Sequence, residues 1–99
     1  MKKIILLCAA GMSTSMLVEK MRESAATTGY ECTVDAYPIA DAARVGADAD
    51  IILLGPQVRF KAGDVKSLVN CPVVPVDMMA YGMMDGAKVI SQVKGVIGE

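Results

Sequence analysis

Four short apolar runs punctuate this chain of 99 residues, and a segment with helical spacing follows each of them. Three of them, within residues 2–7, 49–54 and 72–76, are rich in Val, Ile and Leu, whereas the second, within 30–37, alternates Cys32, Val34 and Ala36 with polar residues. The helical segments lie within residues 15–26, 39–45, 57–70 and 83–97. Continuous apolar runs of this length are typical of strands that are covered on both faces. The alternation therefore predicts an α/β fold, with a single four-stranded parallel sheet and helices on both faces.

Glycine and proline mark the ends of several of these elements. Gly29 follows the first helical segment, where a left-handed residue commonly ends a helix. Pro38 ends the second strand, and Gly55 and Pro56 end the third. Pro75 interrupts the fourth run, and because proline lacks a backbone donor we expect that strand at an edge of the sheet.

The composition indicates one folded domain spanning residues 1–99, without linkers or repeats. Hydrophobic residues make up 54% of the chain and charged residues 21%, as in ordinary globular proteins. The net charge of −1 and the scarcity of aromatic residues argue against a nucleic-acid partner. The chain has no histidine, which excludes Ser-His-Asp and Cys-His mechanisms, histidine-ligated metals and an imidazole phosphate carrier within it.

The three cysteines are widely spaced and form no C-x-x-C motif. They predict neither a disulfide framework nor a metal site, and they fit a reducing, cytoplasmic environment. The apolar stretch before Cys8 is too short for a lipoprotein signal. No run is long enough to span a bilayer, so we expect no direct membrane insertion and any membrane role to come through a partner.

The segment after the first strand is the strongest candidate for chemistry. Parallel sheets bind ligands beyond the carboxyl ends of their strands, and here Cys8 is followed by small and hydroxyl-bearing residues that lead into a helix. Small residues let backbone N–H groups approach an anion, and the helix N-terminus favours negative charge. No G-K-[ST] lysine is present, which excludes a Walker loop. The predicted phosphate-binding residues are Ala9, Ala10, Gly11, Met12, Ser13, Thr14 and Ser15.

Cys8 stands at the mouth of this loop. Helix N-termini favour the thiolate form of cysteine, which is the nucleophilic form. We therefore expect Cys8 to be the catalytic residue and to become phosphorylated. The alternative is a buried structural cysteine at a strand end, since cysteine is among the most buried residue types.

Cysteine phosphatases share the order of strand, cysteine, phosphate loop and helix, and we expect a topology like that of the low-molecular-weight phosphatases. Their pattern is Cys-x5-Arg-[Ser/Thr], but Thr14 stands at the arginine position here. Without a guanidinium in the loop to stabilise transition-state charge, the simplest inference is that the phosphocysteine resists hydrolysis and passes its phosphoryl group on. A low-molecular-weight phosphatase-like enzyme and a non-catalytic regulator that senses a phosphorylated partner or an oxidant remain as alternatives.

The chain resembles the cytosolic IIB component of the lactose/cellobiose/chitobiose branch of the bacterial phosphoenolpyruvate-dependent sugar phosphotransferase system. The residues that carry this resemblance are 4–15 (IILLCAAGMSTS), 52–58 (ILLGPQV), 75–77 (PVD) and 81–86 (YGMMDG). The resemblance implies that Cys8 accepts phosphate from a histidine of a phosphorylated IIA protein. It then passes the phosphate to a sugar held by the membrane IIC permease, such as cellobiose, chitobiose or lactose. It implies a cytoplasmic protein that IIC recruits to the membrane, with no cofactor. The sequence does not single out the sugar.

A methionine-rich segment follows the fourth strand on the same predicted edge. Methionine adapts to more than one partner, so we expect an apolar rim that contacts IIA and IIC in turn. The candidate rim residues are Gln57, Met78, Met79, Tyr81, Met83 and Met84. Core packing is the alternative for Tyr81, Met83 and Met84, and a plain turn role for Gln57. Arg59 and Lys61 are expected to be solvated, with electrostatic steering of a phosphorylated partner as the alternative.

Overall fold

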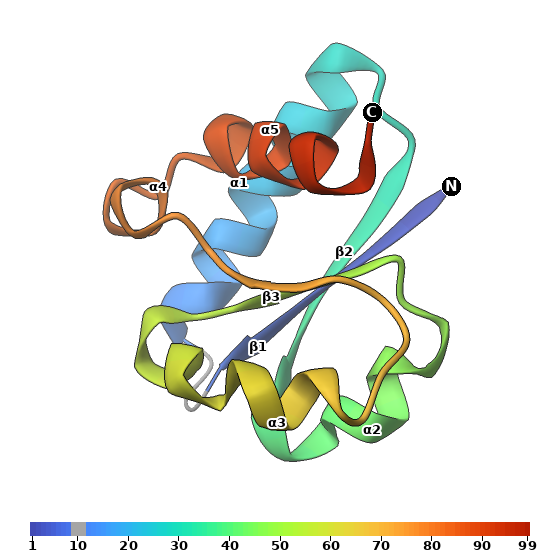
Figure 1. Cartoon of the computed structure of the whole chain (residues 1–99). Helices are drawn as coiled ribbons and strands as arrows, with labels where there is room; N and C mark the ends of the chain where they lie inside the picture. The colour runs from blue at the N-terminus through green and yellow to red at the C-terminus, as the bar shows by residue number, and fades with distance from the viewer. Residues whose placement is uncertain (9–11) are drawn as a thin grey trace.

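The computed structural model describes residues 1–8 and 12–99 of the chain (Figure 1). Its centre is a four-stranded sheet in the order β2-β1-β3-β4, in which all neighbouring strands are parallel. The strands are β1 (Lys2–Cys8), β2 (Cys32–Pro38), β3 (Ile51–Leu54) and β4 (Val73–Pro75). The predicted parallel sheet is confirmed, and β4 lies at an edge as expected.

Helices cover both faces of the sheet. In Figure 1, α1 and α5 lie on one side of it and α2 and α3 on the other. The helices are α1 (Met12–Thr28), α2 (Ala42–Val45), α3 (Ala62–Lys66), α4 (Met78–Gly82) and α5 (Gly86–Ile97). Three 3-10 segments complete the described elements: η1 (Ile39–Asp41), η2 (Gly46–Asp48) and η3 (Pro56–Lys61).

The alternation of side chains along the central strand β1 divides the core into two layers. Ile4 and Leu6 belong to the layer beneath α1 and α5, whereas Ile5 and Leu7 belong to the layer shared with α2 and α3. All four are at most 2% exposed. Burial on both faces explains why the strand reads as a continuous apolar run.

The segment after β4 differs from the sequence prediction. The sequence predicts one helical segment after this strand, within residues 83–97, but residues 78–82 form the separate helix α4 and α5 begins only at Gly86. Two side-chain caps explain the boundaries: the Asp77 carboxylate accepts from Ala80 N at 2.9 Å, and the Asp85 carboxylate accepts from Lys88 N at 3.1 Å. Met84, with φ of 52°, separates the two helices.

The boundaries of other helices differ from the predicted ones by fewer residues. The first helix extends to both sides of the predicted 15–26, so that residues 12–15 of the expected phosphate loop form its first turn. The predicted helix over 39–45 is split into η1 and α2, and the helical segment predicted within 57–70 is divided between η3 and the short helix α3. Gly29 has φ of +73°, which confirms the expected left-handed helix end.

Candidate active site

The strand order reverses direction at β1, because the chain passes from β1 to β2 on one side and returns to β3 on the other. In open parallel sheets such a reversal opens a ligand site beyond the carboxyl ends of the strands. Cys8 is the last residue of β1, and Gly55 directly follows β3. The two central strands therefore deliver the predicted nucleophile and the Gly55-Pro56 turn to the same edge.

Gly55 lies against the end of β1. Its N–H donates to Leu7 O at 2.9 Å, and a Cβ placed on Gly55 would lie 3.7 Å from Cys8 Cβ. Val58 N donates in turn to Gly55 O at 3.0 Å, so η3 begins its turn immediately beside Cys8. The turn after β3 therefore packs directly against the end of β1.

Cys8 itself is 3% exposed. Its Sγ contacts Tyr37 O on the neighbouring strand β2 at 3.9 Å, a weak interaction at this length. Burial alone is compatible with both roles considered for this residue, a structural thiol and a nucleophile. Its place at the reversal of strand order, ahead of a helix N-terminus, is the feature that distinguishes the second role.

The predicted phosphate loop falls partly outside the described residues. This applies to Ala9, Ala10 and Gly11, and to the side chains of Met12 and Ser13. Thr14 is 1% exposed, and its Oγ1 has no hydrogen-bond partner among the described atoms. Ser15 is exposed and lines a pocket of about 240 Å³ together with Val18, Glu19, Arg22, Asp35 and Ala36.

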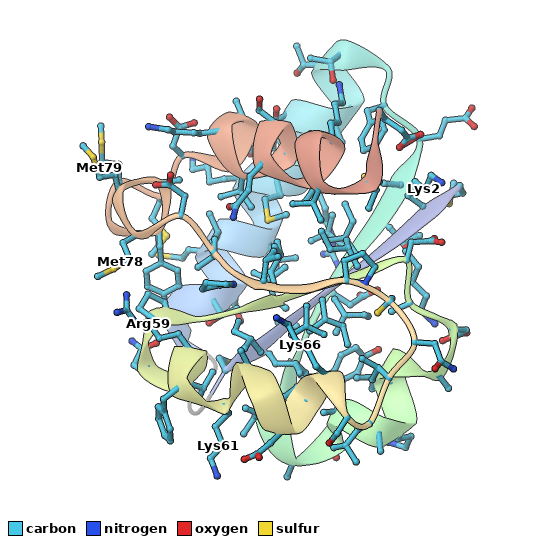
Figure 2. The ribbon with its side chains drawn as sticks, in the orientation of Figure 1. Lys2, Arg59, Lys61, Lys66, Met78 and Met79 are labelled. Carbon is cyan, nitrogen blue, oxygen red and sulfur yellow. The ribbon has the colours of Figure 1, made fainter. Side chains whose placement is uncertain are left out.

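The α4 segment reaches the same edge through β4. Val76 N donates to Leu54 O at 2.9 Å, which extends the pairing of β3 and β4 by one residue. The next residue, Asp77, caps α4. Arg59 in η3 then donates from Nη1 to Met78 Sδ at 3.0 Å, and Figure 2 shows these two side chains next to each other. The segments after β3 and β4 are therefore in direct contact.

The candidate rim residues divide into two groups. Met78, Met79 and Met83 are 58%, 66% and 73% exposed, and Gln57 is also exposed. Tyr81 and Met84 are partly buried and pack against the core beneath α1 and α5, as their alternative reading expected.

One residue that we did not single out belongs with the exposed group: Phe60 in η3 is 77% exposed. Its position three residues after Gln57, in the segment that leaves β3, was the available sequence signal.

Cys32 and Cys71 lie away from this edge. Cys32 pairs in register with Lys2 at the opposite end of β1, and Cys71 precedes β4. Partial burial raises the pKa of both thiols. Both properties fit a structural role for these two cysteines.

Comparison with known proteins decides the family. The model of the family described as "PTS system, Lactose/Cellobiose specific IIB subunit" matches residues 3–92. This chain belongs to that IIB family. The resemblance inferred from the sequence is confirmed, and IIB components are phosphotransferases of the sugar phosphotransferase system that work with IIA and IIC partners.

Individual IIB relatives cover nearly the whole chain. The oligo-beta-mannoside-specific EIIB component of Bacillus subtilis is 43% identical, over 93% of this chain and 92% of its own length. The galactose-specific EIIB component of Lactococcus lactis subsp. cremoris is 41% identical, over 97% of this chain and 96% of its own length.

Solved IIB structures share the fold. The lactose-specific IIB domain from Streptococcus pneumoniae superposes with a TM-score of 0.85 at 21% identity, covering 96% of each chain. The cellobiose-specific IIB protein from Borrelia burgdorferi gives a TM-score of 0.80 at 30% identity, covering 98% of this chain and 92% of its own. In the part of this chain that the structure describes, no helix has the length and apolarity needed to cross a membrane.

Proposed function

We propose that this IIB component carries its phosphoryl group on Cys8. The group comes from the phosphohistidine of a IIA protein and goes to a sugar bound by the membrane IIC permease. The observation that carries this proposal is the position of Cys8, which ends the central strand β1 where the strand order reverses. The segment after it leads directly into the N-terminus of α1.

Two displacements move the phosphoryl group. In the first, the Cys8 thiolate attacks phosphorus, the P–N bond to histidine breaks and an S–P bond forms; the proton of the thiol ends on the released imidazole. In the second, a sugar hydroxyl attacks phosphorus and loses its proton to water, while the S–P bond breaks and its electron pair stays on sulfur, which regenerates the thiolate. Positioning and electrostatic stabilisation of the phosphoryl oxygens supply the catalysis.

The phosphoryl oxygens are held by the loop that follows Cys8. Its proposed donors are backbone N–H groups and the hydroxyls of its serine and threonine residues. The loop residues are Ala9, Ala10, Gly11, Met12, Ser13, Thr14 and Ser15. The Thr14 hydroxyl supports this assignment, because it is buried and has no partner among the described atoms. A buried hydroxyl without a partner costs about 1–3 kcal/mol, and a phosphoryl oxygen would supply the missing acceptor.

IIA and IIC bind in turn to the rim around Cys8, because one thiol has to meet both. We assign this role to the exposed side chains of Gln57, Met78, Met79 and Met83, with Tyr81 and Met84 packed behind them. Residues 1–99 act as one domain on the cytoplasmic side, recruited to the membrane through IIC.

The transported sugar is a β-linked disaccharide of the cellobiose, chitobiose or lactose kind. Relatives specific for oligo-beta-mannosides, galactose and cellobiose are all about equally similar to this chain. That spread supports selection of the sugar by IIC rather than by IIB.

Intact-mass measurement tests the proposal. The protein is incubated with phosphoenolpyruvate, the general phosphocarrier proteins and a lactose/cellobiose-type IIA, as wild type and as Cys8→Ser, with Cys32→Ser and Cys71→Ser as matched controls. We expect one phosphoryl group on wild type and on both controls, none on Cys8→Ser, and little free phosphate released. No adduct on wild type in the presence of phosphorylated IIA would refute the proposal, and rapid release of phosphate would favour the phosphatase alternative.

A further inference from the structure

A phosphoryl group on Cys8 brings a concentration of negative charge to an edge whose own loop contains no cation. Residues 8–15 include no Lys or Arg. Phosphoryl transfer relies on cationic groups that neutralise the oxygens around phosphorus, and guanidinium is the side chain best suited to do so. If such a cation acts here, another segment of the chain has to supply it.

The topology brings Arg59 to this edge. Gly55 lies against Cys8 and Leu7, and Val58 N bonds back to Gly55 O, so Arg59 follows one turn after the contact with the end of β1. Arg59 is the first basic residue after β3. Lys61 and Lys66 follow it, and Figure 2 shows both side chains well away from the pair of Arg59 and Met78.

The contacts of Arg59 leave its charge uncompensated. Among the described residues, Arg22 and Arg44 each form an ion pair with an aspartate, at 3.0 and 3.1 Å. Arg59 forms no ion pair in that set, and its guanidinium donates instead to Met78 Sδ at 3.0 Å. A thioether is a weak acceptor, so exchanging it for a phosphoryl oxygen is favourable.

We infer that Arg59 is the cationic partner of the phosphoryl group on Cys8, held beside the site by Met78 until the phosphoryl group arrives. This inference rests on the proposed function of Cys8. Unlike the loop arginine of cysteine phosphatases, Arg59 lies outside the phosphate loop: it comes from η3 and reaches the group from the side of β3. No bond to Arg59 forms or breaks; its guanidinium donates N–H hydrogen bonds to the phosphoryl oxygens.

When Arg59 exchanges Met78 Sδ for a phosphoryl oxygen, the rim around Cys8 changes as well. Met78 opens α4, which has five residues and carries the exposed Met79 as well. When Arg59 turns toward the phosphoryl group, Met78 loses its partner and its side chain is released. The surface offered to IIC then differs from the surface offered to IIA, although both include the same residues.

Single-turnover transfer from phosphorylated IIA tests this role. Rates are measured at saturating IIA for wild type, Arg59→Gln and Arg59→Lys, with Lys66→Gln as a control that removes another exposed cation. We expect Arg59→Gln to be slower by at least about 10-fold, Arg59→Lys to lie between it and wild type, and Lys66→Gln to match wild type.

A spectroscopic readout separates direct contact from a structural effect. The side-chain Nε–H resonance of Arg59 and the methyl resonance of Met78 are followed by NMR before and after phosphorylation, and both should shift. Wild-type saturating rates in Arg59→Gln, or a loss of rate only at low salt and subsaturating IIA, would show steering alone and overturn the inference. Failure of the wild type to be phosphorylated would instead overturn the proposed function.

Discussion

Gly86, the first residue of α5, lies directly against the backbone of Lys20 in α1. A Cβ placed on Gly86 would lie 2.3 Å from the carbonyl carbon of Lys20 and 2.5 Å from Met21 N. Neither atom can move without shifting the helix, so the missing side chain allows the two helices to pack closely.

Substitution of Gly86 by alanine should therefore destabilise the protein. We expect Gly86→Ala to lower the free energy of unfolding by about 1–3 kcal/mol, the usual cost of overpacking. Gly95 is the matched control, because it lies within the same helix and a Cβ there would meet nothing within 4 Å. Gly95→Ala should raise the free energy of unfolding by about 0.5–1 kcal/mol through helix propensity. Urea denaturation measures both, and equal effects of the two substitutions would contradict the packing assigned to Gly86.

Replacement of Thr14 by valine should separate stability from function. Valine has nearly the same shape and removes the buried hydroxyl that lacks a partner among the described atoms. We expect Thr14→Val to be as stable as wild type or more stable, by up to about 1 kcal/mol. The same variant should accept phosphate on Cys8 more slowly, since it has lost a proposed donor. Thr14→Ser is the control that keeps the hydroxyl, and a wild-type transfer rate in Thr14→Val would remove Thr14 from the site.

The Asp77 cap should matter for the segment that carries Met78. Its carboxylate accepts from Ala80 N, while its own N–H donates to Gln92 Oε1 on α5 at 2.9 Å. We expect Asp77→Ala to lower the free energy of unfolding by about 1 kcal/mol and Asp77→Asn to have a much smaller effect, because asparagine also caps helices. Thermal denaturation gives the comparison. Equal losses in the two variants would show that the carboxylate charge, rather than the cap, is what stabilises α4.

The pair of Lys3 and Asp48 makes a pH-dependent contribution. Hydrogen bonding to Lys3 lowers the pKa of Asp48 from its ordinary 3.8, and hydrogen bonding to Asp48 raises the pKa of Lys3 from its ordinary 10.5. The Asp48 contribution is fully present above pH 3.8 and is lost as pH falls through the lowered pKa. The Lys3 contribution is present below pH 10.5 and is lost as pH rises through the raised pKa.

Both groups are exposed, so the effect should be small and should weaken with salt. The difference in Tm between wild type and Asp48→Asn should be largest near neutral pH and should vanish in strong acid. A difference that persists there would point to another role for Asp48.

The thiols of Cys32 and Cys71 should be poor nucleophiles. Burial raises the pKa of each above its ordinary 9.0, so less thiolate is present at a given pH than in a free cysteine. We expect iodoacetamide to modify both more slowly than an unstructured cysteine peptide at about pH 8. Peptide mapping by mass spectrometry resolves the two sites, and denaturant should abolish the protection.

Much of the fold is determined by local patterns in the sequence. The apolar runs around Ile4 and Ile52 predict strands covered on both faces, and the helical spacing between runs predicts parallel connections. Glycine at position 29 predicts its left-handed conformation. The order of Cys8, small residues, hydroxyl residues and helix predicts where an anion would bind, because each step depends only on neighbours in the chain.

Tertiary structure decided what depends on contacts between distant segments. The packing of Gly86 on Lys20, the burial of Thr14 and the contact of Arg59 with Met78 join residues from different elements, and no local pattern encodes them. The division of the rim into exposed Met83 and partly buried Met84 depends on the positive φ of Met84, where α4 stops short of α5. Local periodicity sets which residues form an element, but side-chain packing between elements sets which of their atoms remain free to act.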